Sequence, residues 1–173
     1  MVKLTFAKRA AMPAIEVAVP IMPESMKQGI YVTLAYVSLF YLFILGQQVA
    51  KWQLKAYYHS KGKRMLRYYN STESKMLGWD RTVGNMLEQA MPFLTLFWVN
   101  IALDIINSSS SGTVITAGWC YVAFRFLYPV FWFNGGGGRS GGSSKMLFCT
   151  GPMYAVIAFL AWEACVNCHV KDT

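Results

Sequence analysis

Residues 28–50 read QGIYVTLAYVSLFYLFILGQQVA, a run of 23 uncharged residues between Lys27 and Lys51. A helix of about 20 residues is long enough to cross a bilayer core of roughly 30 Å. Three more largely apolar windows follow, at about 85–106, 114–133 and 146–162. These windows lack the alternation of apolar and polar residues that a lipid-facing strand shows, so we expect membrane-spanning helices.

The composition indicates the same class of protein. Hydrophobic residues make up 55% of the chain and charged residues only 14%, whereas soluble domains carry roughly 25% charged residues. The chain has a net charge of +8, and eight of its 16 Lys and Arg residues lie in residues 51–81. This concentration favours contact with membrane lipids over a nucleic-acid partner. We therefore expect an all-α, integral membrane, antiparallel four-helix bundle, with spans at about 28–52, 82–106, 113–134 and 145–166.

Three regions organise the chain. Residues 1–27 form a proline-containing N-terminal tail whose apolar stretch is a candidate for the membrane interface, 28–166 form the four-helix domain, and 167–173 form a short C-terminal tail. Four spans place both termini on one side and the two long loops on the other. Because these loops hold more Lys and Arg, we expect them in the cytosol, or in the matrix of a mitochondrion.

A polar motif opens the second span. Arg81, Asn85 and Glu88 stand at positions i, i+4 and i+7, which share one face of a helix. The arginine can bind a carboxylate and the glutamate an ammonium group, so together they suit a zwitterionic ligand. The same three side chains could instead form a polar clamp that fixes helix packing or the oligomeric state.

Two stretches resemble a known family. Residues 81–93 (RTVGNMLEQAMPF) resemble the second-helix signature of the MAPEG family, the membrane-associated proteins in eicosanoid and glutathione metabolism. Arg125-x-x-Tyr128 resembles a motif of its third helix, and Arg139 follows at the spacing of the family's catalytic arginine. The resemblance covers roughly residues 28–165.

The resemblance implies a glutathione-dependent transferase or peroxidase that acts on lipophilic electrophiles. Arg81, Asn85, Glu88 and Tyr128 would hold glutathione between the subunits of a homotrimer. Arg139 would be the catalytic residue, lowering the pKa of the thiol and holding the nucleophilic thiolate. The membrane would be that of the endoplasmic reticulum or the mitochondrion.

A second hypothesis keeps the fold without the activity. The chain would then be a catalytically inactive accessory subunit, surrounded by unrelated membrane subunits in a larger assembly such as a mitochondrial respiratory complex. Trp132 stands where the family often has a second tyrosine, and Arg139 lies among glycines. Whether the chain is an enzyme stays open at this point.

The C-terminal residues Cys165, Cys168 and His169 fit the pattern Cys-x-x-Cys-His, which attaches haem c covalently. We disfavour covalent haem because only four residues follow the pattern and no pocket is evident. A disulfide or free thiols is the preferred interpretation. No second pair of ligands accompanies them, so we expect no metal site.

Overall fold

The computed structural model describes residues 22–63, 73–107, 112–134 and 147–169. They form four helices: α1 (Glu24–Ser60), α2 (Ser74–Ile106), α3 (Gly112–Asn134) and α4 (Leu147–His169). Each is long and apolar enough to cross a membrane. Hydrocarbon offers no hydrogen bonds to the backbone, and a helix satisfies those groups internally. The all-α, four-helix membrane fold predicted from the sequence is confirmed.

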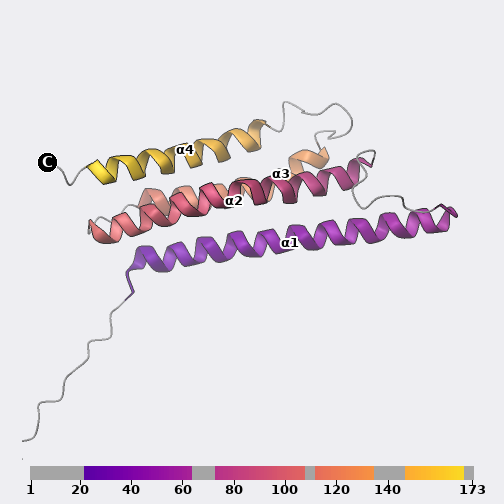
Figure 1. Ribbon diagram of the computed structural model, residues 1–173, viewed down its shortest axis with the longest axis horizontal. Coiled ribbons are helices and arrows are strands. Elements are labelled where there is room, and N and C mark those ends of the chain that lie inside the picture. The colour runs from indigo at the N-terminus through magenta and orange to yellow at the C-terminus, as the bar shows by residue number, and fades with distance from the viewer. Residues whose placement is uncertain (1–21, 64–72, 108–111, 135–146, 170–173) are drawn as a thin grey trace, which may run out of the picture.

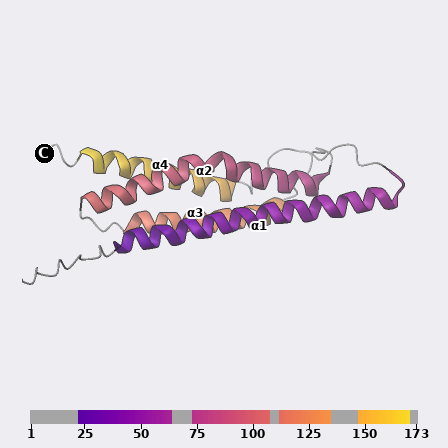
Figure 2. The same cartoon turned by 60° about the horizontal axis from the view of Figure 1, so that its bottom comes forward.

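The helices lie side by side with similar axial directions (Figures 1 and 2). α2 and α3 occupy the middle, and each of them packs against both α1 and α4. Within the described residues, α1 and α4 do not contact each other. The first turn of α1 and the last turn of α4 lie at the same end of the bundle (Figure 1), as an even number of spans requires.

α1 is longer than the predicted span. It has 37 residues, or about 55 Å at 1.5 Å per residue, against a hydrocarbon core of roughly 30 Å. Its extra turns reach past the start of α2 (Figure 1), and α2 itself begins at Ser74. Two hydrogen bonds join the helices there: Gln47 Nε2 donates to Asp80 Oδ1 at 2.6 Å, and Tyr58 OH donates to Glu73 Oε1 at 2.7 Å. α1 is thus longer than a hydrocarbon core requires, and its C-terminal half is joined by hydrogen bonds to the start of α2 and to the residue before it.

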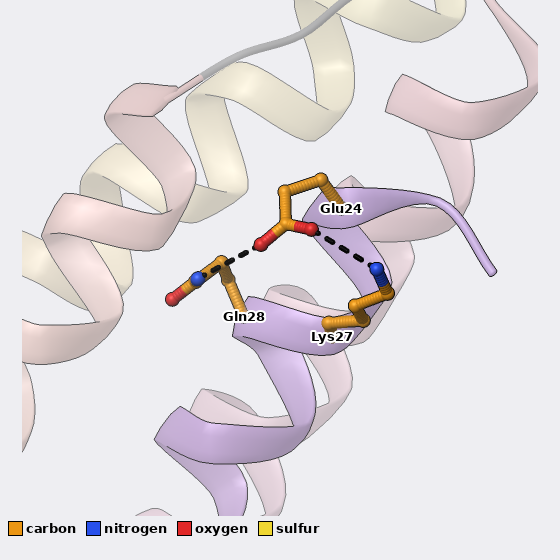
Figure 3. A network of polar contacts seen from close by, with 3 residues as sticks. All are labelled: Glu24, Lys27 and Gln28. Atoms are coloured by element: carbon orange, nitrogen blue, oxygen red, sulfur yellow. Dashed lines mark hydrogen bonds and ion pairs between the residues drawn. The ribbon is translucent and has the colours of Figure 1, made fainter.

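The opposite end of α1 is marked by a charged turn. Glu24 accepts hydrogen bonds from Lys27 Nζ at 3.3 Å and from Gln28 Nε2 at 3.0 Å (Figure 3). A carboxylate in the first turn also interacts favourably with the positive end of the helix dipole. All of these contacts are exposed, and they stabilise the first turn of α1.

Aromatic rings fill the centre of the bundle. Phe93 stacks on Tyr121 with ring centroids 3.8 Å apart, and Tyr36 and Phe97 lie 5.5 and 5.7 Å from Phe93. All four side chains are buried. Rings from α1, α2 and α3 thus meet at one level and set the register of the three helices.

Glycines allow the helices to approach closely where such rings cross. A Cβ atom on Gly46 would lie 2.5 Å from the ring of Trp79, and one on Gly118 would lie 2.6 Å from the ring of Phe97. Real carbon atoms do not approach so closely, because contacts are optimal at about 3.5–4.0 Å. The missing side chains therefore make the space that the rings occupy.

Polar side chains link neighbouring helices through backbone carbonyls. Tyr36 OH donates to the carbonyl of Met86 at 2.8 Å, which ties α1 to α2. Asn100 Nδ2 donates to the carbonyl of Leu160, also at 2.8 Å, which ties α2 to α4. Such bonds help to hold helices together where the hydrophobic effect gives little drive for association.

Candidate functional site

The motif Arg81, Asn85 and Glu88 lies in the N-terminal half of α2. Arg81 and Glu88 are exposed in the single chain, and Asn85 is half-buried between α2 and α3. Glu88 makes no hydrogen bond or ion pair with any other described residue. The motif is thus open on one side, with Asn85 turned inward and the two charged residues turned outward.

Asn85 joins the motif to α3. Its Nδ2 donates a hydrogen bond to the hydroxyl of Tyr128. Arg81 and Arg125 both interact electrostatically with the same hydroxyl group. The structure therefore brings together three of the residues singled out in the sequence, Arg81, Asn85 and Tyr128, from two different helices.

A buried polar network lies directly beneath this pair. The Nη2 atom of Arg125 donates to the carbonyl oxygen of Asn85 at 2.9 Å, to Gln89 Oε1 at 2.5 Å and to the hydroxyl of Tyr121 at 3.1 Å. Tyr121 OH also donates to Gln89 Oε1 at 3.2 Å. Gln89 and Tyr121 did not figure in the sequence analysis. The sequence did offer one signal for Gln89: its amide side chain lies one helical turn after Asn85, within a span whose other residues are mostly apolar.

Trp132 occupies the place where the family often has a second tyrosine. Its ring stacks on that of Tyr128, with centroids 6.5 Å apart and planes inclined by 21°. A Cβ atom on Gly78 of α2 would lie 2.6 Å from the indole, so the glycine makes room for it. Trp132 therefore supports Tyr128 by packing.

An exposed stripe runs down α2 from the motif. Its residues are separated by alternating steps of four and three, the spacing of a seam between packed helices. We call it the α2 stripe: Arg81, Asn85, Glu88, Pro92, Thr95, Val99, Ala102 and Ile106. All are exposed in the single chain except Asn85, which is half-buried.

The outer face of α1 has a different composition. Its exposed positions carry Tyr31, Leu34, Tyr41, Leu45 and Trp52, which are bulky groups suited to acyl chains and to the interface. The α2 stripe instead combines charged, polar and small residues with two larger apolar ones, Val99 and Ile106. Such a surface fits contact with protein better than contact with lipid.

The other residues named in the sequence analysis are Arg139 and the C-terminal pattern of Cys165, Cys168 and His169. Arg139, the predicted catalytic arginine, lies outside the described residues, as does the side chain of His169. Cys165 and Cys168 are exposed near the end of α4 as free thiols. Among the described residues, no group of three or more His, Cys, Asp or Glu side chains is placed to hold a metal ion.

Comparison with known proteins identifies the family of this four-helix membrane protein. Neither a curated protein nor a solved structure matches the chain. The model of the MAPEG family matches residues 31–159, about three quarters of the chain and the greater part of all four helices. This integral membrane protein therefore belongs to the MAPEG family.

Proposed function

We propose that this protein is a glutathione-dependent transferase or peroxidase that acts on lipophilic electrophiles in the membrane of the endoplasmic reticulum or the mitochondrion. The carrying observation is the Asn85–Tyr128 hydrogen bond next to Arg81. Asn85 is half-buried between α2 and α3, and Arg81 and Glu88 are exposed on the same stretch of α2. We further propose that the protein is a homotrimer in which a neighbouring subunit covers these residues.

The exposed charges support a site between subunits. A carboxylate such as that of Glu88, left in hydrocarbon, costs at least ~2.5 kcal/mol. The ammonium group of glutathione would neutralise Glu88, and a glutathione carboxylate would pair with Arg81. Asn85 and Tyr128 would then fix the orientation of the peptide. Ligand and neighbouring subunit together would remove both charges from lipid.

In the proposed transferase reaction the thiolate of glutathione attacks an electrophilic carbon of the lipid, such as an epoxide carbon. A carbon–sulfur bond forms while the carbon–oxygen bond of the epoxide breaks, and the resulting alkoxide takes up a proton from water. Arg139, by resemblance to the family, would stabilise the thiolate. A free thiol with a pKa near 8.5 is mostly protonated at neutral pH, so a nearby guanidinium increases the reactive fraction. The lipid would enter from the bilayer and glutathione from the aqueous side.

The first experiment measures glutathione binding to the purified protein in detergent by isothermal titration calorimetry. Glu88→Gln should weaken binding about 10- to 100-fold, because a hydrogen bond to a charged group contributes about 1.5–3 kcal/mol. Glu163→Gln, which removes a carboxylate from the far end of α4, is the matched control and should leave binding unchanged. Arg139→Ala should lower turnover while glutathione affinity is kept.

The second experiment tests the assembly by light scattering in detergent. Val99→Trp places a large ring in the α2 stripe and should reduce the trimer fraction. Val49→Trp places the same ring on the outer face of α1, where Val49 is 48% exposed against 40% for Val99, and should leave the trimer intact.

The accessory-subunit hypothesis predicts different results. Wild-type protein would bind no glutathione at millimolar concentration, and Glu88→Gln would change no binding signal. A single copy would purify with unrelated membrane proteins. This pattern would remove the enzymatic proposal and leave the MAPEG fold as a structural element.

A further inference from the structure

Arg125 is a buried cation in the middle of a membrane helix bundle. Its side chain is only 1% exposed, and its acceptors are an amide oxygen of Gln89, a hydroxyl of Tyr121 and the carbonyl of Asn85. The guanidinium also lies over the ring of Tyr121, 5.4 Å from its centroid. One nitrogen, Nη1, is buried and has no hydrogen-bond partner among the described residues.

The positive charge is not balanced within the described residues. All acceptors of Arg125 are uncharged, and no described carboxylate lies within ion-pair distance of its guanidinium. The ionisable groups that interact electrostatically with Arg125 are Tyr36 on α1 and Tyr121 and Tyr128 on α3. Arg81 on α2 and Cys149 on α4 interact with Tyr128. The nearest acid along α2, Glu88, is exposed on the outer face. Arg81 adds a second positive charge to the same region.

Packing alone explains this arrangement poorly. Replacing a buried ionic group by apolar residues of similar volume often leaves stability unchanged or increases it. Burying a guanidinium whose described partners are all neutral costs more free energy than filling the same space with apolar side chains. A negatively charged ligand group would offset this cost, because opposite charges attract strongly where water is excluded.

We propose that the uncompensated charge of Arg125 makes the site around Asn85 and Tyr128 selective for an anionic group. Arg125 is a positioning residue in this proposal: it holds the backbone of Asn85 through the carbonyl and supplies a fixed positive field from beneath. The anion is a thiolate or a carboxylate of the ligand. Only the choice of glutathione as that ligand rests on the proposed function.

A cysteine reporter tests the field without any ligand. Asn85→Cys is introduced after Cys120, Cys149, Cys165 and Cys168 have been replaced by serine or alanine. The carbonyl at position 85 is retained, so the contact with Arg125 can persist. The rate of reaction with methyl methanethiosulfonate, a neutral reagent, at pH 7 then reports the thiolate fraction at this position.

Gln89→Glu is the decisive second substitution. It keeps the shape and the acceptor oxygen of the side chain but places a carboxylate against Arg125. We expect the reporter rate to fall about tenfold, because the field of the guanidinium is cancelled. Gln48→Glu adds the same charge at an exposed position of α1, and it should change the rate less than twofold. Equal rates in the two variants would overturn the proposal.

Arg125 itself supplies a test against a purely structural role. Arg125→Lys keeps the charge and should retain most of the reporter rate, whereas Arg125→Met should slow the reaction. If Arg125 only stabilised the bundle, both variants would loosen it and expose the thiol, and both rates would rise. Gln89→Glu keeps the experiment informative if Arg125→Met fails to fold.

Glutathione and ophthalmic acid, which carries a methyl group in place of the thiol, identify the anion. Gln89→Glu should weaken glutathione alone if the group is the thiolate, and both ligands if it is a carboxylate. Unchanged affinity for both would overturn the proposal. If wild-type protein binds neither ligand, the proposed function fails, and the reporter rate alone decides whether Arg125 makes the site around Asn85 anion-selective.

Discussion

Gly118 offers the sharpest test of how the bundle is packed. A Cβ atom at this position would lie 2.6 Å from Phe97 Cε2 and 3.0 Å from Val32 Cγ1, about 1 Å inside normal contact. Phe97 is fully buried and stacks on Phe93, so its ring has little freedom to move aside. Overpacking of this kind costs about 1–3 kcal/mol, whereas the change from glycine to alanine in a helix gains about 0.5–1 kcal/mol. Gly118→Ala should therefore destabilise the protein by up to about 2 kcal/mol.

Gly151→Ala is the matched control, because a Cβ atom there would meet nothing within 4 Å. It keeps the gain in helix propensity without the clash, so the difference between the two variants isolates the steric cost. At about 2–4 °C per kcal/mol for a protein of this size, their melting temperatures should differ by about 2–12 °C. Tryptophan fluorescence during heating in detergent measures both. A Gly118→Ala protein that melts at or above the Gly151→Ala protein would refute the packing described here.

Two further predictions concern single hydroxyl groups. Tyr58→Phe removes the hydrogen bond to Glu73 and should speed amide hydrogen exchange at the start of α2 by about 2- to 13-fold, which corresponds to about 0.5–1.5 kcal/mol. The control is Tyr57→Phe at the exposed neighbouring position, which should leave the exchange rate unchanged. Tyr128→Phe removes the partner of Asn85 and should weaken glutathione binding by a similar factor in calorimetry, and an unchanged affinity would place the ligand elsewhere.

The fold was largely predictable because hydrophobicity decides it. The run at 28–50 can neither dissolve in water nor span the bilayer as an open strand, so a helix was the remaining solution. The ends of the helices were less predictable. The sequence analysis ended the first span near residue 52, after Lys51, but α1 continues to Ser60, because Lys, Gln, Leu and Ala are all good helix formers. The charged residues were used to end the predicted span, but they do not end the helix.

The sequence predicted which site residues share a face of one helix, but it did not predict which residues contact each other between helices. The spacing of Arg81, Asn85 and Glu88 fixes their common face whatever surrounds them. The partnership of Gln89 with Arg125 depends on the register of α2 against α3. Buried aromatic rings and glycines set that register through contacts between residues far apart in the sequence. No local pattern therefore distinguished Gln89 from any other polar residue in a span.

The two faces of α2 are associated with charges of opposite sign, and Asn85 lies between these faces. The inner face carries Gln89, which accepts from the buried Arg125. The outer face carries Glu88, a carboxylate without a partner among the described residues. An inert scaffold needs neither charge, since apolar side chains would pack both faces at lower cost. A zwitterionic ligand held between subunits requires both, because its negative group would meet the field of Arg125 and its positive group would meet Glu88. The separation of these two charges across one helix is thus a stronger argument for binding than either charge alone.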